Sequence, residues 1–267
     1  MKIAIIGGGA MGEAIIRGVV AAGSLYHQDI SVCDIDASRL KTLKQNYGIK
    51  PVNKYEAALK DADLVVLAVK PQTLPTLLPD LKGKIKKGRL VLSIIAGAKI
   101  DTIAKGLDHQ QIVRAMPNTP AQIGVGMTAW TASDKVTAKQ KKLAQSVLDA
   151  LGKEVYVDSE KYIDMATAVS GSGPAYFFYM IECLTDAAVK IGLPRETAGE
   201  LVMETVLGAA LLAKQSPKSP QELRKQVTSP GGTTAAGIAV LESGKFKELL
   251  SETVAAAHKR AKELDGK

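Results

Sequence analysis

The sequence is poor in the residue types that mark several common classes of protein. Only 4% of its 267 residues are aromatic, and it has two cysteines and three histidines. Cys33 and Cys183 lie far apart, in a predicted strand and a predicted helix, so we expect two reduced, buried thiols rather than a disulfide or a metal pair. His27, His109 and His258 show no ligand spacing, so no metal site is predicted.

Long apolar runs are also missing. The longest uncharged stretch, residues 115–133, is broken by prolines and polar residues and does not predict a membrane span. The apolar run after Lys2 is short and is followed by Glu13 and Arg17, which argues against a secretory signal. The sequence therefore predicts a cytoplasmic protein that does not bind a membrane.

Positive charge is in excess but is not concentrated. The formal net charge is +8 and the isoelectric point is about 9.3, which suits anionic ligands. The basic residues are dispersed and do not alternate with aromatic residues, so we do not expect nucleic-acid binding. With 46% hydrophobic residues, the chain can bury a large core, and its length favours two domains.

The first dozen residues carry a glycine motif. The apolar run Ile3–Ile6 predicts a buried parallel strand, and the spacing G-x-G-x-x-G follows it on Gly7, Gly9 and Gly12, before a helical pattern. Gly7 permits the sharp turn, Gly9 lets a pyrophosphate approach, and Gly12 lets helix and strand pack closely. The phosphates would lie at the helix N-terminus, so a dinucleotide-binding turn is predicted.

The rest of the first half alternates short apolar runs with amphipathic segments, which predicts a parallel sheet covered by helices. The second half has no further strand of any length. Its predicted helices begin near Pro174, Arg195 and Phe246, with shorter ones ending at Gln226 and Glu242. The sequence thus predicts an α/β chain with a Rossmann-type, mostly parallel sheet domain at residues 1–159 and an all-α domain at residues 160–267.

One predicted helix is apolar around nearly its whole circumference. Residues 206–213 carry only aliphatic side chains and glycine. Such helices are buried, and a small helical domain is too thin to bury this one alone. Two interpretations remain open: a core helix beneath the first domain, or a dimer interface in which helices from two chains interdigitate.

Four further motifs are more specific than the glycine turn. They are Ala68-Val69-Lys70-Pro71, Arg114-Ala115-Met116-Pro117-Asn118-Thr119-Pro120, Ser170-Gly171-Ser172-Gly173-Pro174-Ala175-Tyr176 and Ser229-Pro230-Gly231-Gly232-Thr233-Thr234. In this order and spacing the whole chain resembles pyrroline-5-carboxylate reductase, the last enzyme of proline biosynthesis. The resemblance implies hydride transfer from NADPH or NADH to 1-pyrroline-5-carboxylate, giving L-proline. It also implies a helical dimerisation domain, a homodimer and possibly a decamer.

The resemblance assigns site residues. It places the coenzyme against the glycine turn, three strand-end loops and one position on the adenosine side: Ile6, Gly7, Gly8, Gly9, Ala10, Met11, Gly12, Asn53, Ala68, Val69, Lys70, Pro71, Ala96, Gly97, Met116, Pro117 and Asn118. Asp34 is added as a coenzyme residue from its position after the second predicted strand. It places the substrate at Ser229, Gly231, Gly232, Thr233 and Thr234, on a loop contributed by the partner subunit, and near Glu160. An alternative role for Glu160 is a solvated carboxylate at a helix N-terminus.

The chemistry of the loop at residues 229–234 supports a substrate role independently of the resemblance. It precedes a helix, so its N–H groups can converge on a carboxylate, and Gly231 and Gly232 leave the backbone accessible. We expect Thr234 to hydrogen-bond the ring nitrogen, which orients the substrate or relays a proton from water. A plain N-terminal helix turn is the alternative interpretation.

Asp34 departs from the pattern of many relatives, which have a small hydroxyl residue there. It follows the second predicted strand, where a carboxylate binds a ribose 2′-OH and repels a 2′-phosphate. Asp36 would add to the repulsion and Arg39 would partly offset it. We therefore expect NADH to be used at least as well as NADPH.

Two other functions share the first domain. A β-hydroxyacid dehydrogenase needs a catalytic lysine in the helical domain, and Lys190 lacks the expected surrounding motif. A dinucleotide-sensing module would have no use for an anion-binding loop that faces the nicotinamide.

Overall fold

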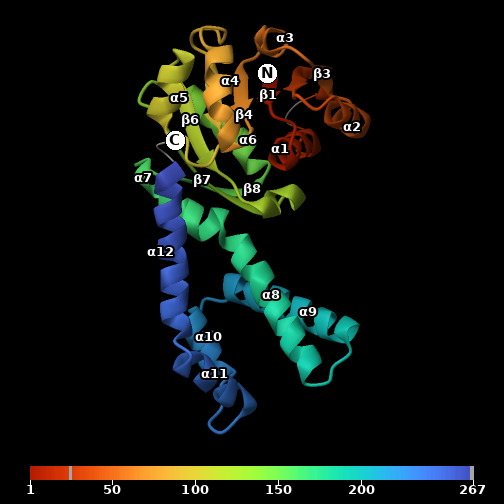
Figure 1. Ribbon diagram of the computed structural model, residues 1–267, viewed down its shortest axis with the longest axis vertical. Helices are drawn as coiled ribbons and strands as arrows, with labels where there is room; N and C mark the ends of the chain where they lie inside the picture. The colour runs from red at the N-terminus through yellow and green to blue at the C-terminus, as the bar shows by residue number, and fades with distance from the viewer. Residues whose placement is uncertain (24–25, 265–267) are drawn as a thin grey trace. The chain divides into compact units, whose positions relative to one another are not determined.

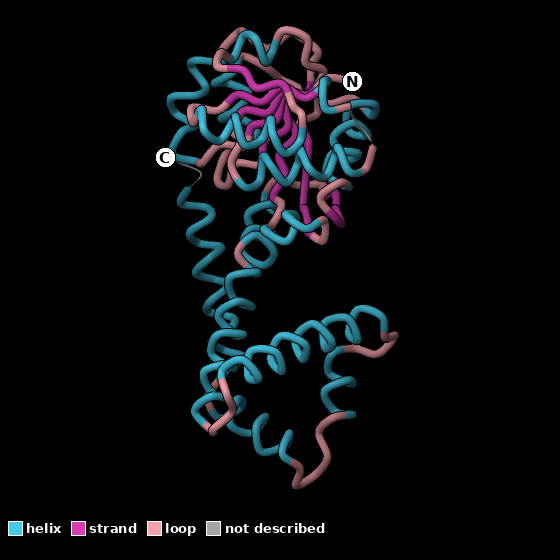
Figure 2. The backbone as a smooth tube through the Cα atoms, turned by 90° about the vertical axis from the view of Figure 1, so that its right-hand side faces the viewer, coloured by secondary structure: helices cyan, strands magenta, loops and turns pink. Residues whose placement is uncertain are grey.

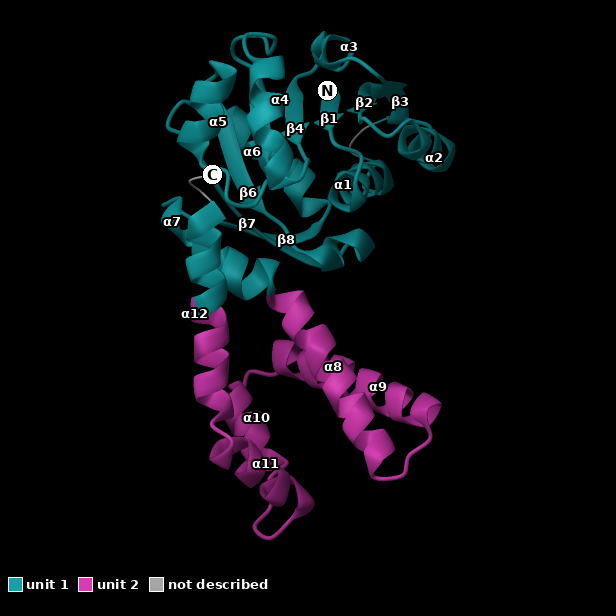
Figure 3. Cartoon of the chain, in the orientation of Figure 1, with its two compact units in different colours: residues 1–172, 256–267 teal, residues 173–255 magenta. Residues whose placement is uncertain are grey.

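The computed structural model describes residues 1–23 and 26–264 and divides into two compact units (Figure 3). Unit 1 contains Met1–Ser172 and the C-terminal segment from Ala256, and unit 2 contains Gly173–Ala255.

Unit 1 is built on a single mostly parallel sheet (Figure 1). Its strands, in chain order, are β1 (Ile3–Ile6), β2 (Ile30–Cys33), β3 (Lys50–Val52), β4 (Leu64–Leu67), β5 (Leu90–Ser93), β6 (Ile112–Met116), β7 (Gly126–Ala132) and β8 (Gly152–Tyr156). The order across the sheet is β3-β2-β1-β4-β5-β6-β7-β8, and among these strands β7 runs antiparallel to β6. The predicted Rossmann-type sheet is confirmed.

Helices cover both faces of this sheet (Figure 2). One face packs against α1 (Ala10–Ala21), α2 (Ala37–Tyr47) and α6 (Ala138–Asp149). The other packs against α3 (Tyr55–Leu59), α4 (Leu74–Leu81) and α5 (Ile100–Leu107).

The central strand β1 shows why its sequence is uniformly apolar. Ile3 and Ile5 belong to the core on the α1 side, whereas Ala4 and Ile6 belong to the core on the α4 side. Successive strand side chains point to opposite faces, so a strand covered on both sides needs apolar residues at every position. Each fully buried isoleucine contributes about 1.5–3 kcal/mol to stability.

The strand order reverses between β1 and β4, which lie next to each other at the centre of the sheet. Chain segments leave the carboxyl ends of these two strands in opposite directions, and this opens a crevice where doubly wound proteins bind their ligands. The loops that follow β1, β4, β5 and β6 all begin at this edge, because these four strands are parallel.

Local signals locate several helix ends correctly. Asp36 caps α2 by accepting hydrogen bonds from the Ser38 and Arg39 N–H groups, and Gly48 ends this helix in the left-handed conformation, with φ of 65°. The sequence made no prediction for α4 and α5. Pro75 and Pro79 in α4 hide its helical pattern, although the first lies in the opening turn, where proline is tolerated.

The segment between the sheet and the long helices belongs to unit 1. It forms α7 (Lys161–Ala166) and a π-helical turn, η4 (Thr167–Gly171). The expected boundary at residue 160 assigns this segment to the helical domain. In the structure α7 contacts β6 and β7, so the division between the compact units follows Ser172.

Unit 2 is helical. It comprises α8 (Gly173–Lys190), α9 (Arg195–Gln215), α10 (Pro220–Gln226), α11 (Thr233–Ser243) and the first part of α12 (Phe246–Leu264). Helices α8 and α9 pack against each other. Within the described chain, no helix combines the length and apolar character needed to span a bilayer.

Unit 2 exposes much of its apolar surface. Phe178 on α8, Leu212 on α9 and Val240 on α11 are 62%, 57% and 70% exposed. The apolar part of α9 is therefore not a core helix in this chain, and its surface is available to another one. Cys183 on α8 is exposed, so the expectation that both thiols are buried is wrong for Cys183, whereas Cys33 is buried in β2.

Candidate active site

The glycine turn after β1 is held by close backbone contacts. Gly7 has φ of +103°, and a Cβ there would lie 2.6 Å from the Ala68 carbonyl oxygen. A Cβ on Gly12 would lie 2.1 Å from the Gly7 carbonyl oxygen. Both positions therefore require glycine, Gly7 for the turn and Gly12 for the contact between α1 and the end of β1.

Gly9 is different. A Cβ on Gly9 would meet no atom within 4 Å, and this exposed residue is the N-cap of α1. No side chain caps the N-terminus of α1, so its first N–H groups face open space. The helix dipole and these N–H groups suit a pyrophosphate, and the absence of a side chain leaves room for one.

Asp34, directly after β2, binds the same turn. Its Oδ2 accepts a hydrogen bond of 2.6 Å from the Gly8 N–H, and its Oδ1 accepts one of 2.9 Å from the Asp36 N–H. The carboxylate thus lies beside the glycine turn, where a dinucleotide-binding fold places its ribose-binding acid.

The remaining expected coenzyme residues lie at the carboxyl edge of the sheet. Asn53 follows β3, residues 68–71 follow β4, residues 96–97 follow β5, and Met116–Asn118 end and follow β6. The structure therefore brings these segments to one edge of unit 1. Gly97, with φ of +72°, lies against Leu264 at the end of α12, and a Cβ on Gly97 would be 2.5 Å from the Leu264 Cβ.

The π-helical turn η4 lies next to the end of β6. The Asn118 Nδ2 donates to the Ser170 Oγ over 3.4 Å, and the Asn118 Oδ1 accepts from the Met127 N–H over 2.9 Å. A Cβ on Gly171 would lie 2.9 Å from the Met116 Cε. Asn118 thus joins the loop after β6 to the motif that begins at Ser170. Single π turns inside helices are frequent at functional sites.

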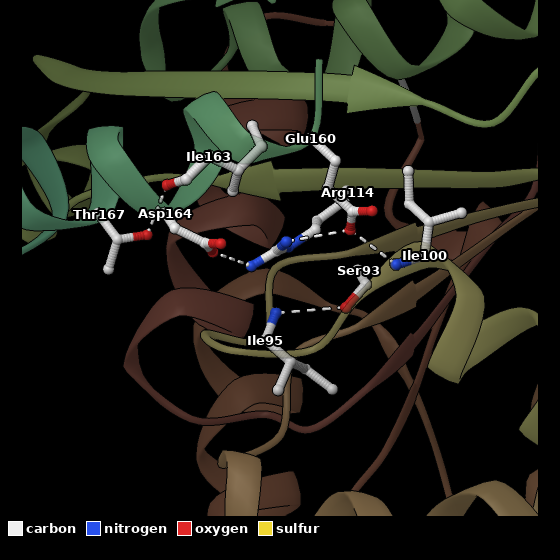
Figure 4. A network of polar contacts seen from close by, with 8 residues as sticks. All are labelled: Ser93, Ile95, Ile100, Arg114, Glu160, Ile163, Asp164 and Thr167. Carbon is white, nitrogen blue, oxygen red and sulfur yellow. Dashed lines mark hydrogen bonds and ion pairs between the residues drawn. The ribbon is translucent and has the colours of Figure 1, made fainter. Parts of the chain in front are cut away.

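A buried cation on β6 is bound by two carboxylates (Figure 4). Arg114 on β6 is 1% exposed, and its Nη2 binds the Asp164 Oδ1 at 2.7 Å while its Nη1 binds the Glu160 Oε1 at 3.0 Å. The same Glu160 oxygen accepts a 2.8 Å hydrogen bond from the Ile100 N–H. One carboxylate therefore connects β6, α7 and the first turn of α5.

The expected substrate loop lies in unit 2, before α11. Gly231 has φ of +72°, and Gly232 is the N-cap of α11, whose N-terminus no side chain caps. Thr233 is exposed and Thr234 is half-buried. The Gly232 N–H donates a 3.0 Å hydrogen bond to the Ser229 carbonyl oxygen, which closes the turn. Because no side chain caps α11, its first N–H groups, beginning at Thr233, can bind an anion.

Several residues of this region have no distinctive sequence signal. Glu13, Tyr47 and Asp164 look like ordinary helix residues, and Arg114 looks like a charged interruption of an apolar strand. The sequence signal for Arg114 is its place at the start of the motif at residues 114–120. His109 is buried with its Nε2 2.6 Å from the Arg89 carbonyl oxygen, and no group of described residues could hold a metal ion.

Comparison with known proteins gives the family. Residues 160–264 match the family model described as pyrroline-5-carboxylate reductase dimerisation, and residues 2–97 match the model described as NADP oxidoreductase, coenzyme F420-dependent. A pyrroline-5-carboxylate reductase of Synechocystis is 42% identical over all of this chain and 99% of that protein. This chain belongs to the pyrroline-5-carboxylate reductase family.

Other members of the family agree in sequence and structure. The reductase of Arabidopsis thaliana is 38% identical over 98% of this chain and 95% of that protein. The structure of the Coxiella burnetii reductase superposes with a TM-score of 0.91 at 41% identity, over 100% of this chain and 99% of that one. The structure of the Plasmodium falciparum reductase, with NADP bound, superposes with a TM-score of 0.90 at 31% identity, over 100% of this chain and 98% of that one. The chain is therefore an oxidoreductase, and its dimerisation domain supports oligomer formation.

The two glycines of the turn should respond differently to the same substitution. Gly9→Ala adds a methyl group in open space, so we expect the free energy of unfolding to change by less than about 0.5 kcal/mol, while NADH binding weakens about tenfold or more. Gly12→Ala inserts the methyl group against the Gly7 carbonyl and should cost about 1–3 kcal/mol of stability. Urea unfolding and fluorescence titration with NADH measure both. Equal stability losses, or unchanged NADH binding in Gly9→Ala, would contradict this account.

Arg114 should be a major contributor to stability. Arg114→Met leaves the Asp164 carboxylate buried without its cation, so we expect unfolding to become easier by about 3–5 kcal/mol. Arg114→Lys keeps the charge but loses the two-partner geometry and should cost less. Adding Asp164→Leu to Arg114→Met should recover part of the loss, because the unpaired carboxylate is removed. A loss below about 1 kcal/mol in Arg114→Met, measured by urea unfolding, would show that the network contributes little.

Proposed function

We propose that this chain reduces 1-pyrroline-5-carboxylate to L-proline with NADH or NADPH, the last step of proline biosynthesis. The observation that carries the proposal is the match to pyrroline-5-carboxylate reductases over the whole chain, 42% identical to one of them. The open glycine turn at Gly9 and the uncapped turn at residues 229–234 are the two anion-binding features that this reaction requires.

The coenzyme is assigned to the carboxyl edge of the sheet. We propose that its pyrophosphate binds at Gly7–Gly12, its adenosine ribose at Asp34 with Asn53 nearby, and its nicotinamide end along residues 68–71, 96–97 and 116–118. When bound, the reduced nicotinamide supplies the hydride. A family relative has NADP bound, which supports a nicotinamide dinucleotide as the ligand class.

The substrate is assigned to the loop before α11, in the partner subunit of a dimer. The backbone N–H groups of Gly231 and Thr233 would hold the carboxylate. Gly232, whose N–H donates to the Ser229 carbonyl oxygen, would keep the turn between them open to the substrate. Fixing the carboxylate positions the C=N carbon for transfer. The Thr234 hydroxyl is the group we assign to the ring nitrogen, where it orients the substrate or passes a proton from water, since a hydroxyl is too weak an acid to protonate it directly.

Glu160 is also assigned to the substrate. Its carboxylate oxygen is already bound by the Ile100 N–H and by Arg114. With its side chain 28% exposed, it retains a second oxygen for the substrate. Glu160 is therefore proposed as a substrate residue at the edge of the site.

The helical domain, residues 160–267, is proposed to form a homodimer, with a decamer as a possible higher assembly. The exposed apolar faces of α8, α9 and α11 support this, since single chains rarely leave such surfaces in water. A cytoplasmic location remains a prediction from the sequence.

A direct assay tests the activity. We expect the purified protein to oxidise NADH or NADPH only when 1-pyrroline-5-carboxylate is added, with proline as the product. Thr234→Ala should lower kcat by about 10²–10⁴-fold, the range for a positioned proton-transfer group, and should change the Kd for NADH little. Unchanged kcat in Thr234→Ala would remove this residue from the mechanism.

The coenzyme preference tests Asp34. Because its carboxylate accepts a ribose hydroxyl and repels a phosphate, we expect kcat/KM for NADH to equal or exceed that for NADPH in the wild type. Asp34→Ser should shift the ratio toward NADPH. A strong preference of the wild type for NADPH would refute this assignment.

A further inference from the structure

The peptide group of Gly8 is held on both sides by charged side chains. Its N–H donates to the Asp34 Oδ2 over 2.6 Å, and its carbonyl oxygen accepts a 2.6 Å hydrogen bond from the Arg39 Nε. Asp34 follows β2 and Arg39 lies in the first turn of α2. A cation and an anion therefore lie together at the expected ribose position.

Arg39 is already paired. Its Nη2 forms an ion pair with the Glu13 Oε2 on α1, and the Glu13 Oε1 accepts a 2.9 Å hydrogen bond from the Tyr47 hydroxyl at the end of α2. The side chains of Arg39 and Glu13 are 27% and 24% exposed. Such partial burial strengthens the pair relative to one on an open surface.

Glu13 is charged at neutral pH. Burial raises the pKa of this carboxyl, but the hydrogen bonds from Arg39 and Tyr47, together with the charges of Arg39 and Arg17, outweigh it and hold the pKa below its ordinary value. The ion pair therefore persists throughout the physiological pH range.

We infer that Glu13 is a specificity-determining residue, which holds Arg39 against the glycine turn and so withholds its charge from the 2′-phosphate of NADPH. The inference rests on the proposed binding of the coenzyme's ribose at Asp34. Neighbouring arginines accommodate the 2′-phosphate in dinucleotide-binding folds, and a guanidinium binds phosphate well only if its N–H groups are free. Here two of its three nitrogens are occupied.

The charges around the expected ribose position also disfavour the 2′-phosphate of NADPH. Asp34, Asp36 and Glu13 carry three negative charges against the one positive charge of Arg39, which disfavours a phosphate. Loss of the Glu13 charge lowers this negative excess by one and leaves the Arg39 charge unpaired by Glu13. NADH, which lacks the 2′-phosphate, should respond little to the change at Glu13.

The experiment compares Kd values for NADH and NADPH, measured by fluorescence titration without substrate. In Glu13→Gln we expect NADPH to bind roughly 5- to 10-fold more tightly, and NADH to change less than about threefold. Glutamine retains an oxygen for Tyr47, so the fold should be kept. Asp34→Ser combined with Glu13→Gln should favour NADPH more than either change alone.

The role of Arg39 is tested separately. If Glu13 acts mainly by withholding Arg39, then most of the gain in NADPH binding from Glu13→Gln must be lost in an Arg39→Met background. An equal gain in that background would mean that Glu13 only repels the phosphate directly, and it would overturn the inference. An unchanged ratio of the two Kd values in Glu13→Gln would overturn it as well.

Asp63→Asn is the matched control. Asp63 pairs with Arg89 at the opposite edge of the sheet, before β4, with side chains 38% and 37% exposed. Loss of this carboxylate should leave both Kd values unchanged. Failure of the proposed function can be told apart from failure of this inference. If the protein binds the coenzymes in the expected pattern but does not oxidise NADH or NADPH when 1-pyrroline-5-carboxylate is added, the assigned reaction is wrong and the inference still holds.

Discussion

The close approach of backbone at the glycine turn is the constraint on which the rest of unit 1 depends. Gly7 lies against the Ala68 carbonyl, and Gly12 lies against the Gly7 carbonyl. These contacts fix α1 to the end of β1 and place the loop after β4 beside it. A side chain at either position would separate the elements, and the N-terminus of α1 would no longer face the crevice between β1 and β4.

Charged groups then set the geometry around this backbone frame. Asp34 and Arg39 hold the Gly8 peptide group after β1. Elsewhere in unit 1, Arg114 connects β6 to α7. The two arrangements differ in their exposure to water. Arg114 is almost wholly buried and works as a structural connection, whereas Arg39 is partly exposed and can respond to a ligand. Because of this contrast, we assign a role in stability to Arg114 and a role in coenzyme choice to Arg39.

Unit 2 follows a different principle, since its helices bury few of their apolar side chains within one chain. Phe177, Leu207 and Leu241 are all about half exposed or more. A surface of this kind is stable in water when a second chain covers it, which agrees with the match to the dimerisation model. Folding and assembly of this domain are therefore expected to be coupled.

The sequence by itself determined the parallel sheet, the glycine turn and most helix ends, because apolar periodicity and capping residues act over short distances. The all-apolar β1, the Asp36 cap and the Gly48 stop are examples. It did not indicate α4, whose internal Pro79 obscured the pattern, or the exposure of Cys183, which depends on what covers α8. Only the tertiary structure decided that Glu13 pairs with Arg39 and that Glu160 joins Arg114 to the first turn of α5. The physical reason is separation: these partners lie tens of residues apart, and no local pattern states which distant charge each one meets.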